Sequence, residues 1–339
     1  MIDLNLLQRM IEDGYVNVQK HPQCELFIYN YSAKAQYDYL WNDVTKACRG
    51  LIMDAEMNVV ARPFAKFFNL EEADQSDIPN LPFDVFEKMD GSLGILYWTK
   101  EQAFIATRGS FSSDQANKAN QILHSKYAAA LAQVDRAKTY LFEIIYPDNR
   151  IVVDYGDSEA LVLIAVIDTA TGQDLPLEDI GFPVVRQYHG INDWRTLKAM
   201  ETDNHEGFVI RFQNGQRFKV KFEEYLRLHR IVTHVSSTDI WEHLAAGIPL
   251  DEYLEHVPDE FYHWVKATSK QLQDRFENIE NQCKREFKAL PTRKESAEYF
   301  AACTYPNVLF KMLDGRPYQD VIWKMIKPEF QKAFSVTKE

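Results

Sequence analysis

The sequence predicts an α+β protein in which mainly antiparallel sheets with flanking helices are followed by an all-helical C-terminal domain. Short apolar runs with a two-residue period recur as far as Phe222, which is typical of β-strands. Two of these runs flank Asn214-Gly215, a strong signal for a β-hairpin. From about Ile240 the apolar residues recur at helical spacings instead. We therefore expect one domain over residues 1–238 and a second over residues 239–339.

Composition and charge narrow the class of protein. Of the 339 residues, 46% are hydrophobic and 26% are charged, which is ordinary for a soluble globular protein. The chain has no apolar run of membrane-spanning length and no apolar signal core at its N-terminus, so we expect a cytoplasmic protein without membrane contact. Separately, we expect the protein to be a monomer. Four scattered cysteines indicate neither a zinc site nor a disulfide framework. The net charge of -12 argues against a surface that is basic all over, but it leaves room for a local basic cleft.

The N-terminal part is expected to begin with a helix from Leu4 to Glu12 and a strand from Leu26 to Tyr31. A hairpin follows, in which Arg49 to Asp54 pairs with Asn58 to Ala61. The stretch Lys66-Phe67-Phe68 then places a cation before two aromatic side chains. A base or a phosphate could contact both kinds of side chain; alternatively, the aromatics belong to the core and Lys66 is solvated.

One lysine stands where a predicted strand meets a turn. In the run from Asp84 to Gly94, a two-residue period places Phe86 and Lys88 on the same strand face. Gly91 then allows the backbone to turn close to a ligand. A lysine nucleophile has to be neutral, and burial and neighbouring cations favour the neutral form. Taken alone, the stretch more often belongs to an exposed lysine beside an Asp-Gly turn.

Paired strands and a helix are predicted after this lysine. Leu93 to Trp98 is expected to pair with Ala103 to Thr107, and a helix capped at Ser112 or Ser113 to extend to about Ala132. A continuous apolar strand is expected from Leu161 to Ile167. We expect these elements to have a structural role.

Charged residues stand within two of the later predicted strands. Glu143 lies inside the apolar run from Tyr140 to Tyr146, where a buried carboxylate needs a metal, a cation or a hydroxyl partner. In the second strand of the Asn214-Gly215 hairpin, cations alternate with apolar residues, so one strand face is cationic. The cations are Arg217, Lys219 and Lys221. The alternative is a solvated edge strand protected by its lysines.

Several short motifs follow one another along the chain. They are Arg49-Gly50, Lys66-Phe67-Phe68, Lys88-Met89-Asp90-Gly91, Phe142-Glu143, Glu206-Gly207 and Lys219-Val220-Lys221. This ordered series resembles that of the covalent nucleotidyltransferases, the superfamily of DNA ligases, RNA ligases and mRNA capping enzymes. The continuation Gly91-Ser92-Leu93 and the run from Lys66 to Leu70 are most similar to the phage-type ATP-dependent RNA ligases of the RNA ligase 1 family. That family has a lysine where this chain has Arg108, which keeps the charge.

The resemblance implies a covalent nucleotidyltransferase fold and a three-step reaction. The Lys88 amine would attack ATP and form lysyl-AMP, the adenylate would pass to an RNA 5′-phosphate, and a 3′-hydroxyl would then displace AMP. Catalytic roles are implied for Lys88, Asp90, Lys219 and Lys221. Nucleotide-binding roles are implied for Arg49, Lys66, Phe68, Gly91, Arg108, Glu143 and Gly207. The implied ligands of Mg²⁺ or Mn²⁺ are Glu206 and Glu143, because hard cations suit carboxylate oxygens.

The resemblance also implies partners. The substrate would be RNA with 5′-phosphate and 3′-hydroxyl ends, with cleaved tRNA as a candidate and a polynucleotide kinase-phosphatase as functional partner. The C-terminal domain would select the RNA, and the reaction would take place in the host cytoplasm if a phage encodes the chain. Three alternatives stay open at this point. They are an mRNA-capping-type guanylyltransferase, a DNA-specific ligase and a non-catalytic RNA-binding relative.

Overall fold

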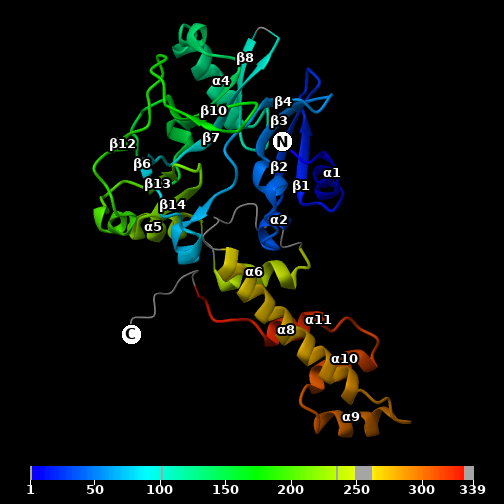
Figure 1. The fold of residues 1–339 in the computed structure, drawn as a ribbon. Helices are drawn as coiled ribbons and strands as arrows, with labels where there is room; N and C mark the ends of the chain where they lie inside the picture. The colour runs from blue at the N-terminus through cyan, green and yellow to red at the C-terminus, as the bar shows by residue number, and fades with distance from the viewer. Residues whose placement is uncertain (1, 101, 234–235, 249–261, 332–339) are drawn as a thin grey trace. The chain divides into compact units, whose positions relative to one another are not determined.

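The computed structural model describes residues 2–100, 102–233, 236–248 and 262–331 (Figure 1). The chain divides into two compact units, Met1–Val232 and Thr233–Glu339. Three β-sheets and several helices make up the first unit, and every described element of the second is a helix. The predicted α+β class is therefore confirmed. The roles assigned to residues 1–238 and 239–339 stay predictions.

A four-stranded antiparallel sheet begins the first unit, with its strands in chain order. They are β1 (Val16–Lys20), β2 (Leu26–Tyr31), β3 (Arg49–Asp54) and β4 (Val59–Ala61). Three helices accompany this sheet, namely α1 (Leu4–Glu12), α2 (Ala33–Tyr37) and α3 (Asp43–Ala47). Local signals fix two helix starts: the Asp3 side chain accepts the backbone N–H of Leu6, and Asn42 forms a capping box with Thr45.

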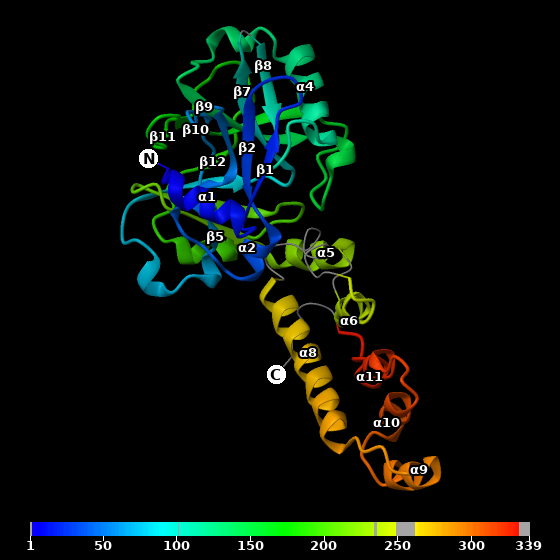
Figure 2. The same ribbon diagram turned by 90° about the vertical axis from the view of Figure 1, so that its right-hand side faces the viewer.

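A five-stranded antiparallel sheet has the order β11-β10-β9-β7-β8. Its strands are β7 (Ser92–Thr99), β8 (Gln102–Ala106), β9 (Lys138–Ile145), β10 (Ala160–Asp168) and β11 (Asp174–Leu175). Helix α4 (Asp114–Lys126) lies against β7, β8 and β10, as Figure 2 shows for β7 and β8. The buried side chains between helix and sheet include Ile105, Ile122 and Leu163, and they form an apolar core.

The third sheet has the order β12-β6-β13-β14-β5 and positions the candidate site. Its strands are β5 (Phe68–Asn69), β6 (Phe83–Lys88), β12 (Gln187–Tyr188), β13 (Gly207–Phe212) and β14 (Arg217–Lys221). Only the contact of β14 with β5 is parallel among these pairs. Residues 89–91 lead from β6 of this sheet directly to β7 of the second sheet. Lys88 consequently ends a strand at the point where the chain passes from one sheet to the other.

Short 3₁₀ helices and one α-helix complete the first unit. The 3₁₀ helices are η1 (Leu70–Glu72), η2 (Gln75–Asp77), η3 (Ala130–Gln133), η4 (Pro147–Asn149) and η5 (Trp194–Met200). Helix α5 (Glu223–Thr233) follows β14 after one residue, and Tyr225 in its first turn is buried. This places a tyrosine close to the end of the strand that carries Lys219 and Lys221.

One expectation from the sequence is wrong, and so is one alternative that the sequence left open. The alanine-rich pattern predicts a helix to about Ala132, but α4 ends at Lys126. Tyr127 leaves the helix and stacks on Phe182 with ring centroids 4.6 Å apart, so packing outweighs the helix preference of the next alanines. The alternative of a solvated edge strand is wrong because β14 lies between β13 and β5 and Lys219 is only 9% exposed.

The second unit contains the helices α6 (Ser237–Ala245), α8 (Tyr262–Glu286), α9 (Arg293–Ala301), α10 (Pro306–Leu313) and α11 (Gln319–Met325). Its core contains Cys283, Phe300 and Leu309, which are fully buried. Thr292 and Glu295 form a capping box at the start of α9. No helix in the described part of the chain is long and apolar enough to cross a lipid bilayer.

Candidate active site

Lys88 and Lys221 both bind one buried carboxylate. The Lys88 Nζ atom lies 2.7 Å from Glu206 Oε2, and the Lys221 Nζ atom lies 3.0 Å from Glu206 Oε1. Strand pairing explains the arrangement, because Gly207 lies opposite Lys88 on β6 and opposite Lys221 on β14. Burial acts to raise the pKa of Glu206, but the two ammonium groups outweigh it and hold the pKa below its ordinary value. The Lys88 side chain is 19% exposed, so an exposed turn lysine is not what this position holds.

The glycine between these two lysines is required by the backbone. Gly207 has a φ of +143°, and a Cβ atom there would lie 1.9 Å from the Val220 carbonyl oxygen. No side chain fits at that separation. Close approach of β13 to β14 at Gly207 is therefore what brings Lys88 and Lys221 to the same carboxylate.

Asp90 fixes the loop that follows Lys88. Its Oδ1 atom accepts a hydrogen bond of 2.8 Å from the Tyr225 hydroxyl. Its Oδ2 atom accepts the backbone N–H groups of Val152 and Val153, also at 2.8 Å. The Asp90 N–H in turn donates to the Tyr155 hydroxyl at 2.8 Å. With these partners Asp90 is 3% exposed, and it acts as a structural clamp on the loop.

Glu143 contacts the same loop from the neighbouring sheet. The Gly91 N–H donates to Glu143 Oε1 at 3.0 Å. A Cβ atom at Gly91 would lie 2.6 Å from the Ile144 carbonyl oxygen, so only glycine allows this approach. Burial raises the pKa of Glu143 to about 7; Lys88 opposes this shift, and Glu206 and Asp90 add to it. The sequence-based expectation that this carboxylate needs partners is met by a backbone N–H and a nearby lysine.

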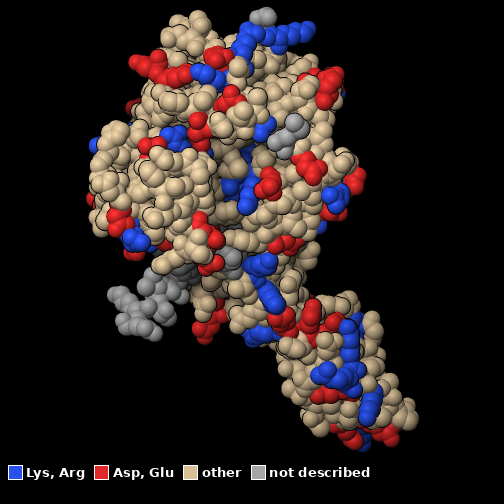
Figure 3. Space-filling model, in the orientation of Figure 1, with Lys and Arg blue, Asp and Glu red and all other residues tan. Residues whose placement is uncertain are grey.

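A cavity of about 190 Å³ opens beside Lys88. Figure 3 shows lysine and arginine side chains gathered in a hollow on the surface of the first unit. The cations lining the cavity are Arg49, Lys88, Arg211, Arg217 and Lys219. Apolar side chains complete the wall, among them Phe64, Phe67, Phe86, Ile164 and Val209. An apolar slot with cations at its wall suits a ligand that combines an aromatic ring with phosphate groups.

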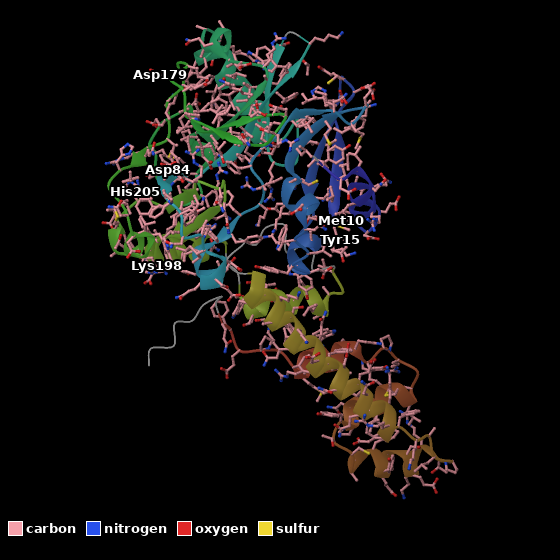
Figure 4. All side chains as sticks on the ribbon, viewed as in Figure 1. Met10, Tyr15, Asp84, Asp179, Lys198 and His205 are labelled. Carbon is pink, nitrogen blue, oxygen red and sulfur yellow. The ribbon has the colours of Figure 1, made fainter. Side chains whose placement is uncertain are left out.

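Two arginines of the cavity wall are held by acidic partners. Arg211 Nη2 lies 2.8 Å from Asp84 Oδ2, and Arg217 forms an ion pair with Asp174. Asp84 is labelled in Figure 4 among the side chains of the first unit. The Arg211 guanidinium lies 5.0 Å from the Phe86 ring centroid, so it is held by both a charge and a ring. These ion pairs fix the arginines at the wall of the cavity.

Lys66 and Arg108 meet at one tyrosine hydroxyl. The Arg108 Nη1 atom lies 2.8 Å from the Tyr31 hydroxyl, and the Lys66 Nζ atom lies 3.4 Å from it. Lys66 is 7% exposed, so the solvated alternative for this lysine is wrong. Phe67 lines the cavity and Phe68 is not among its lining residues. The predicted residues thus form two groups, one at the cavity and one around Tyr31.

The sequence also matches the model of a known protein family. The model of a family described as RNA ligase matches residues 47–226, just over half of the chain. The chain belongs to the RNA ligase family. The resemblance seen in the ordered motifs is therefore confirmed, and the matched range includes all of the predicted site residues.

Three relatives of this RNA ligase family member show how far the likeness extends. A Thermovibrio ammonificans protein named as a candidate RNA ligase is 28% identical over 225 residues, covering 61% of this chain and 58% of the relative. A protein of Autographa californica nuclear polyhedrosis virus is named as a candidate bifunctional polynucleotide kinase/RNA ligase. It is 25% identical, and the match covers 72% of this chain and 39% of the relative. The RNA ligase of Rhodothermus phage RM378 is 24% identical and covers 88% and 84%. The chain spans about half the length of the first two relatives.

The residues of this RNA ligase family member fit a divalent cation that is shared with phosphate. Among the residues that the structure describes, no group of three or more His, Cys, Asp and Glu side chains is arranged to hold a metal ion. Glu206 and Glu143 are close enough for each carboxylate charge to act on the other. Mg²⁺ is often held by one or two carboxylates with substrate phosphates as further ligands. The donor set therefore matches a cation that arrives with a nucleotide.

Sequence reasoning missed the tyrosines that support the RNA ligase motifs. Tyr155 and Tyr225 hold Asp90, and Tyr31 joins Lys66 to Arg108. The only local signal is that Tyr225 follows Lys221 by four residues, in the first turn of a helix. The other contacts join residues 35, 65 and 77 positions apart in the sequence, which no short motif reveals.

Proposed function

We propose that the chain is an ATP-dependent RNA ligase that joins 5′-phosphate and 3′-hydroxyl ends through lysyl-AMP and an adenylylated RNA 5′ end. The observation that carries the proposal is the convergence of Lys88, Lys221 and Glu206 beside a cation-lined cavity in a member of the RNA ligase family. Nucleotidyl transfer depends mainly on alignment and on stabilisation of phosphate charge. These residues supply both.

In the first step, the neutral Lys88 amine attacks the α-phosphorus of ATP. A P–N bond forms, the bond from that phosphorus to the bridging oxygen breaks, and pyrophosphate leaves. Since an amine in an ion pair is not a nucleophile, the Lys88 contact with Glu206 has to open before attack. Lys219 and Lys221 neutralise the α-phosphate charge, while Asp90 keeps the Lys88 loop in place.

The second and third steps transfer the adenylate and then seal the RNA. An oxygen of the RNA 5′-phosphate attacks the AMP phosphorus, which breaks the P–N bond and returns the Lys88 amine. The 3′-hydroxyl of the other end then attacks the RNA 5′-phosphorus, forms the phosphodiester and releases AMP. Arg49, Lys66 and Arg108 contact phosphates or ribose in this scheme, and Phe68, Gly91 and Gly207 belong to the nucleotide-binding part of the site.

Glu206, with Glu143, would hold the divalent cation. When bound, Mg²⁺ or Mn²⁺ neutralises phosphate charge. Glu143 has a second possible partner in the ribose hydroxyls of the nucleotide, since a carboxylate accepts hydrogen bonds from hydroxyl groups. Both carboxylates lie beside Lys88, so a nucleotide that reaches the lysine also reaches them.

RNA repair is the proposed setting. Cleaved tRNA is the candidate substrate, and a polynucleotide kinase-phosphatase would prepare its ends in the cytoplasm of the cell, which is a host cell if a phage encodes the chain. One relative, named for both kinase and RNA ligase activities, supports this pairing. The helical unit after residue 238 is proposed to select the RNA.

A joining assay tests the proposed function. Single-stranded RNA with a 5′-phosphate and a 3′-hydroxyl is incubated with Mg²⁺ and ATP, GTP or NAD, in parallel with DNA of the same sequence. We expect circular or joined RNA with ATP, together with 5′-adenylylated RNA. Joining of DNA alone would indicate a DNA ligase, since a 2′-hydroxyl distinguishes the two polymers. Transfer from GTP alone would indicate a capping-type enzyme, and RNA binding without any product would indicate a non-catalytic relative.

A further inference from the structure

Three aromatic side chains surround Lys66 at the edge of the candidate site, and a fourth lies next to them. The Lys66 Nζ atom lies 5.2 Å from the Tyr31 ring centroid, 5.3 Å from that of Trp41 and 5.7 Å from that of Phe68. Tyr39 lies next to this group, 5.9 Å from Phe68 and 6.4 Å from Trp41. We call Tyr39, Trp41 and Phe68 the aromatic platform. The reaction scheme gives no role to Tyr39 or Trp41.

Tyr39 is the part of the platform that faces solvent. Its side chain is 49% exposed, whereas most aromatic rings of the described chain are buried or half-buried. Its backbone has a φ of +54°, an uncommon conformation for a residue other than glycine. The loop maintains this conformation with hydrogen bonds from Tyr39 N–H to the Gln36 carbonyl and from Leu40 N–H to the Ala35 carbonyl. A strained residue that holds an aromatic ring in water suggests a functional surface.

Trp41 has a hydrogen-bonding group without a partner in the described part of the chain. Its indole N–H is buried and has no acceptor among the residues that the structure describes. Buried donors are nearly always paired, so such a group indicates a missing partner. Oxygen atoms of a bound nucleotide would provide an acceptor.

The aromatic platform adjoins the proposed phosphate-binding groups. Lys66 shares the Tyr31 hydroxyl with Arg108, and both cations are proposed to contact phosphate. Phe68 lies on β5, which pairs with the strand that carries Lys219. A ligand with a phosphate at Lys66 therefore has an aromatic surface within one nucleotide of that phosphate. Cationic grooves combined with aromatic rings are the usual means of binding single-stranded nucleic acid.

We propose that the aromatic platform stacks the terminal nucleobase of the RNA strand whose 5′-phosphate enters at Lys66 and Arg108. The proposal rests on the proposed ligase function, which supplies the RNA. Tyr39 receives the base on its exposed ring, which contacts Phe68 in a tilted arrangement and Trp41 edge-on. Because every base has an aromatic face, the site accepts any terminal base. It discriminates against an end that lacks a base.

The test compares two RNA substrates with enzyme that has already been adenylylated. One is an ordinary 5′-phosphorylated RNA, and the other has an abasic nucleotide at its 5′ end. For Tyr39→Ala we expect the RNA concentration at half-maximal AMP transfer to rise roughly five- to 100-fold with the ordinary RNA, as loss of one stacked base predicts. With the abasic RNA the variant and the wild type should be equal. Tyr39→Phe should restore the wild-type value, and self-adenylylation with ATP alone should not change.

Matched controls separate stacking from a structural role. Leu4→Ala removes a side chain of similar exposure, 45%, from α1 of the same unit. It should not change the RNA concentration at half-maximal AMP transfer for either substrate. If Tyr39→Ala weakens the ordinary and abasic substrates equally, or if Tyr39→Phe fails to restore binding, the platform does not stack the 5′ base. The proposal would also be overturned if the effect of Tyr39→Ala disappeared with an abasic nucleotide at the 3′ end of the RNA but not with one at the 5′ end.

A binding measurement keeps the proposal testable if the protein does not adenylylate itself. A 5′-phosphorylated RNA with 2-aminopurine as its terminal base is titrated with the protein without ATP. Stacking on Tyr39 should quench the fluorescence with the wild type and with Tyr39→Phe, but not with Tyr39→Ala. Equal quenching by all three proteins would exclude the platform as the base site. Failure of self-adenylylation by the wild type would instead count against the ligase function.

Discussion

Glu206 is the residue at which the charges of the candidate site converge. It is 2% exposed, and it accepts Lys88 on one oxygen and Lys221 on the other. A buried carboxylate with two ammonium partners has its charge compensated, so it can stay ionised in a place that excludes water. If Lys88 moves away from Glu206, the carboxylate keeps its contact with Lys221, and its other oxygen can bind a different cation. In the proposed reaction this exchange releases the nucleophile when the nucleotide binds.

Glu143 provides a pH-dependent prediction at the residue scale. Its pKa is raised to about 7 in the folded protein from an ordinary value of 4.5, chiefly by burial. The unfolded chain therefore loses this proton at lower pH than the folded chain. The stability that Glu143 contributes is full below pH 4.5 and declines as the pH rises to about 7. Glu143→Gln should raise the free energy of unfolding above pH 7 by on the order of 1–3 kcal/mol and reduce self-adenylylation.

Denaturant unfolding at several pH values checks this prediction. The gain in Glu143→Gln should shrink as the pH falls from 7 to 4.5. Glu159→Gln is the matched control, because hydrogen bonding to Lys118 lowers the pKa of Glu159. Its expected effect on the free energy of unfolding is therefore opposite to that of Glu143→Gln. Glu159→Gln should therefore be slightly less stable than the wild type at neutral pH. A gain in Glu143→Gln that is the same at pH 4.5 and pH 8 would show that the pKa of Glu143 is not raised.

At the scale of elements, one asparagine joins the two segments that surround Lys88. The Asp154 N–H donates to Asn204 Oδ1 at 2.7 Å, and Asn204 Nδ2 donates to the Asp154 carbonyl at 2.9 Å. The first segment supplies the backbone groups of Val152 and Val153 that hold Asp90. The second leads to Glu206 two residues later. Asn204 therefore couples the clamp on the Lys88 loop to the partner of Lys88.

Asn204→Gly tests this coupling. Asn204 has a φ of +58°, which glycine adopts readily, so the substitution removes the two hydrogen bonds and keeps the backbone. We expect a loss of about 1–2 kcal/mol in the free energy of unfolding and a decrease of roughly ten- to 100-fold in the rate of self-adenylylation. Asn214→Gly in the β13–β14 turn also removes a side-chain hydrogen bond but should leave the rate unchanged. Equal effects of the two substitutions on the rate would contradict a positioning role for Asn204.

The elements also show what the sequence can and cannot predict. The β13–β14 hairpin and the strand ending at Lys88 follow from a two-residue period, since one face of each strand is apolar. The end of α4 is set by Tyr127 stacking on a distant ring, which local propensity cannot reveal. In the site, Lys88, Glu206 and Lys221 are predictable as an ordered series of motifs. Tyr225 is not, because it reaches Asp90 across 135 residues of sequence.

At the scale of the whole molecule, charge and chain organisation have to be considered together. The chain has a net charge of -12, yet lysine and arginine side chains gather in a hollow of the first unit (Figure 3). Charge focused in a hollow can attract a polyanion in spite of an acidic total.

The family match ends at residue 226, near the end of the first unit. The family match therefore covers most of the first unit and leaves the helical unit, to which we assign RNA selection as a proposal, outside it.

Deletion of the chain after Thr238 tests the proposed division of roles. Because the groups around Lys88 all belong to the first unit, self-adenylylation should stay within about threefold of the full-length value. Preference among RNA substrates should fall much further, measured as the ratio of joining rates for a cleaved tRNA and an unstructured RNA. If both activities decline equally, the helical unit does not act as a domain for RNA selection.

The covalent intermediate is the central claim, and label retention tests it most directly. The protein is incubated with Mg²⁺ and α-labelled ATP, denatured, and examined for label that stays on the chain. The account predicts label on the wild type and no label on Lys88→Ala. Lys20→Ala is the control and should keep the label, because Lys20 is an exposed lysine that forms an ion pair with Glu25. Label retained by Lys88→Ala, or no label on the wild type with ATP, would contradict the assignment of Lys88 as the nucleophile.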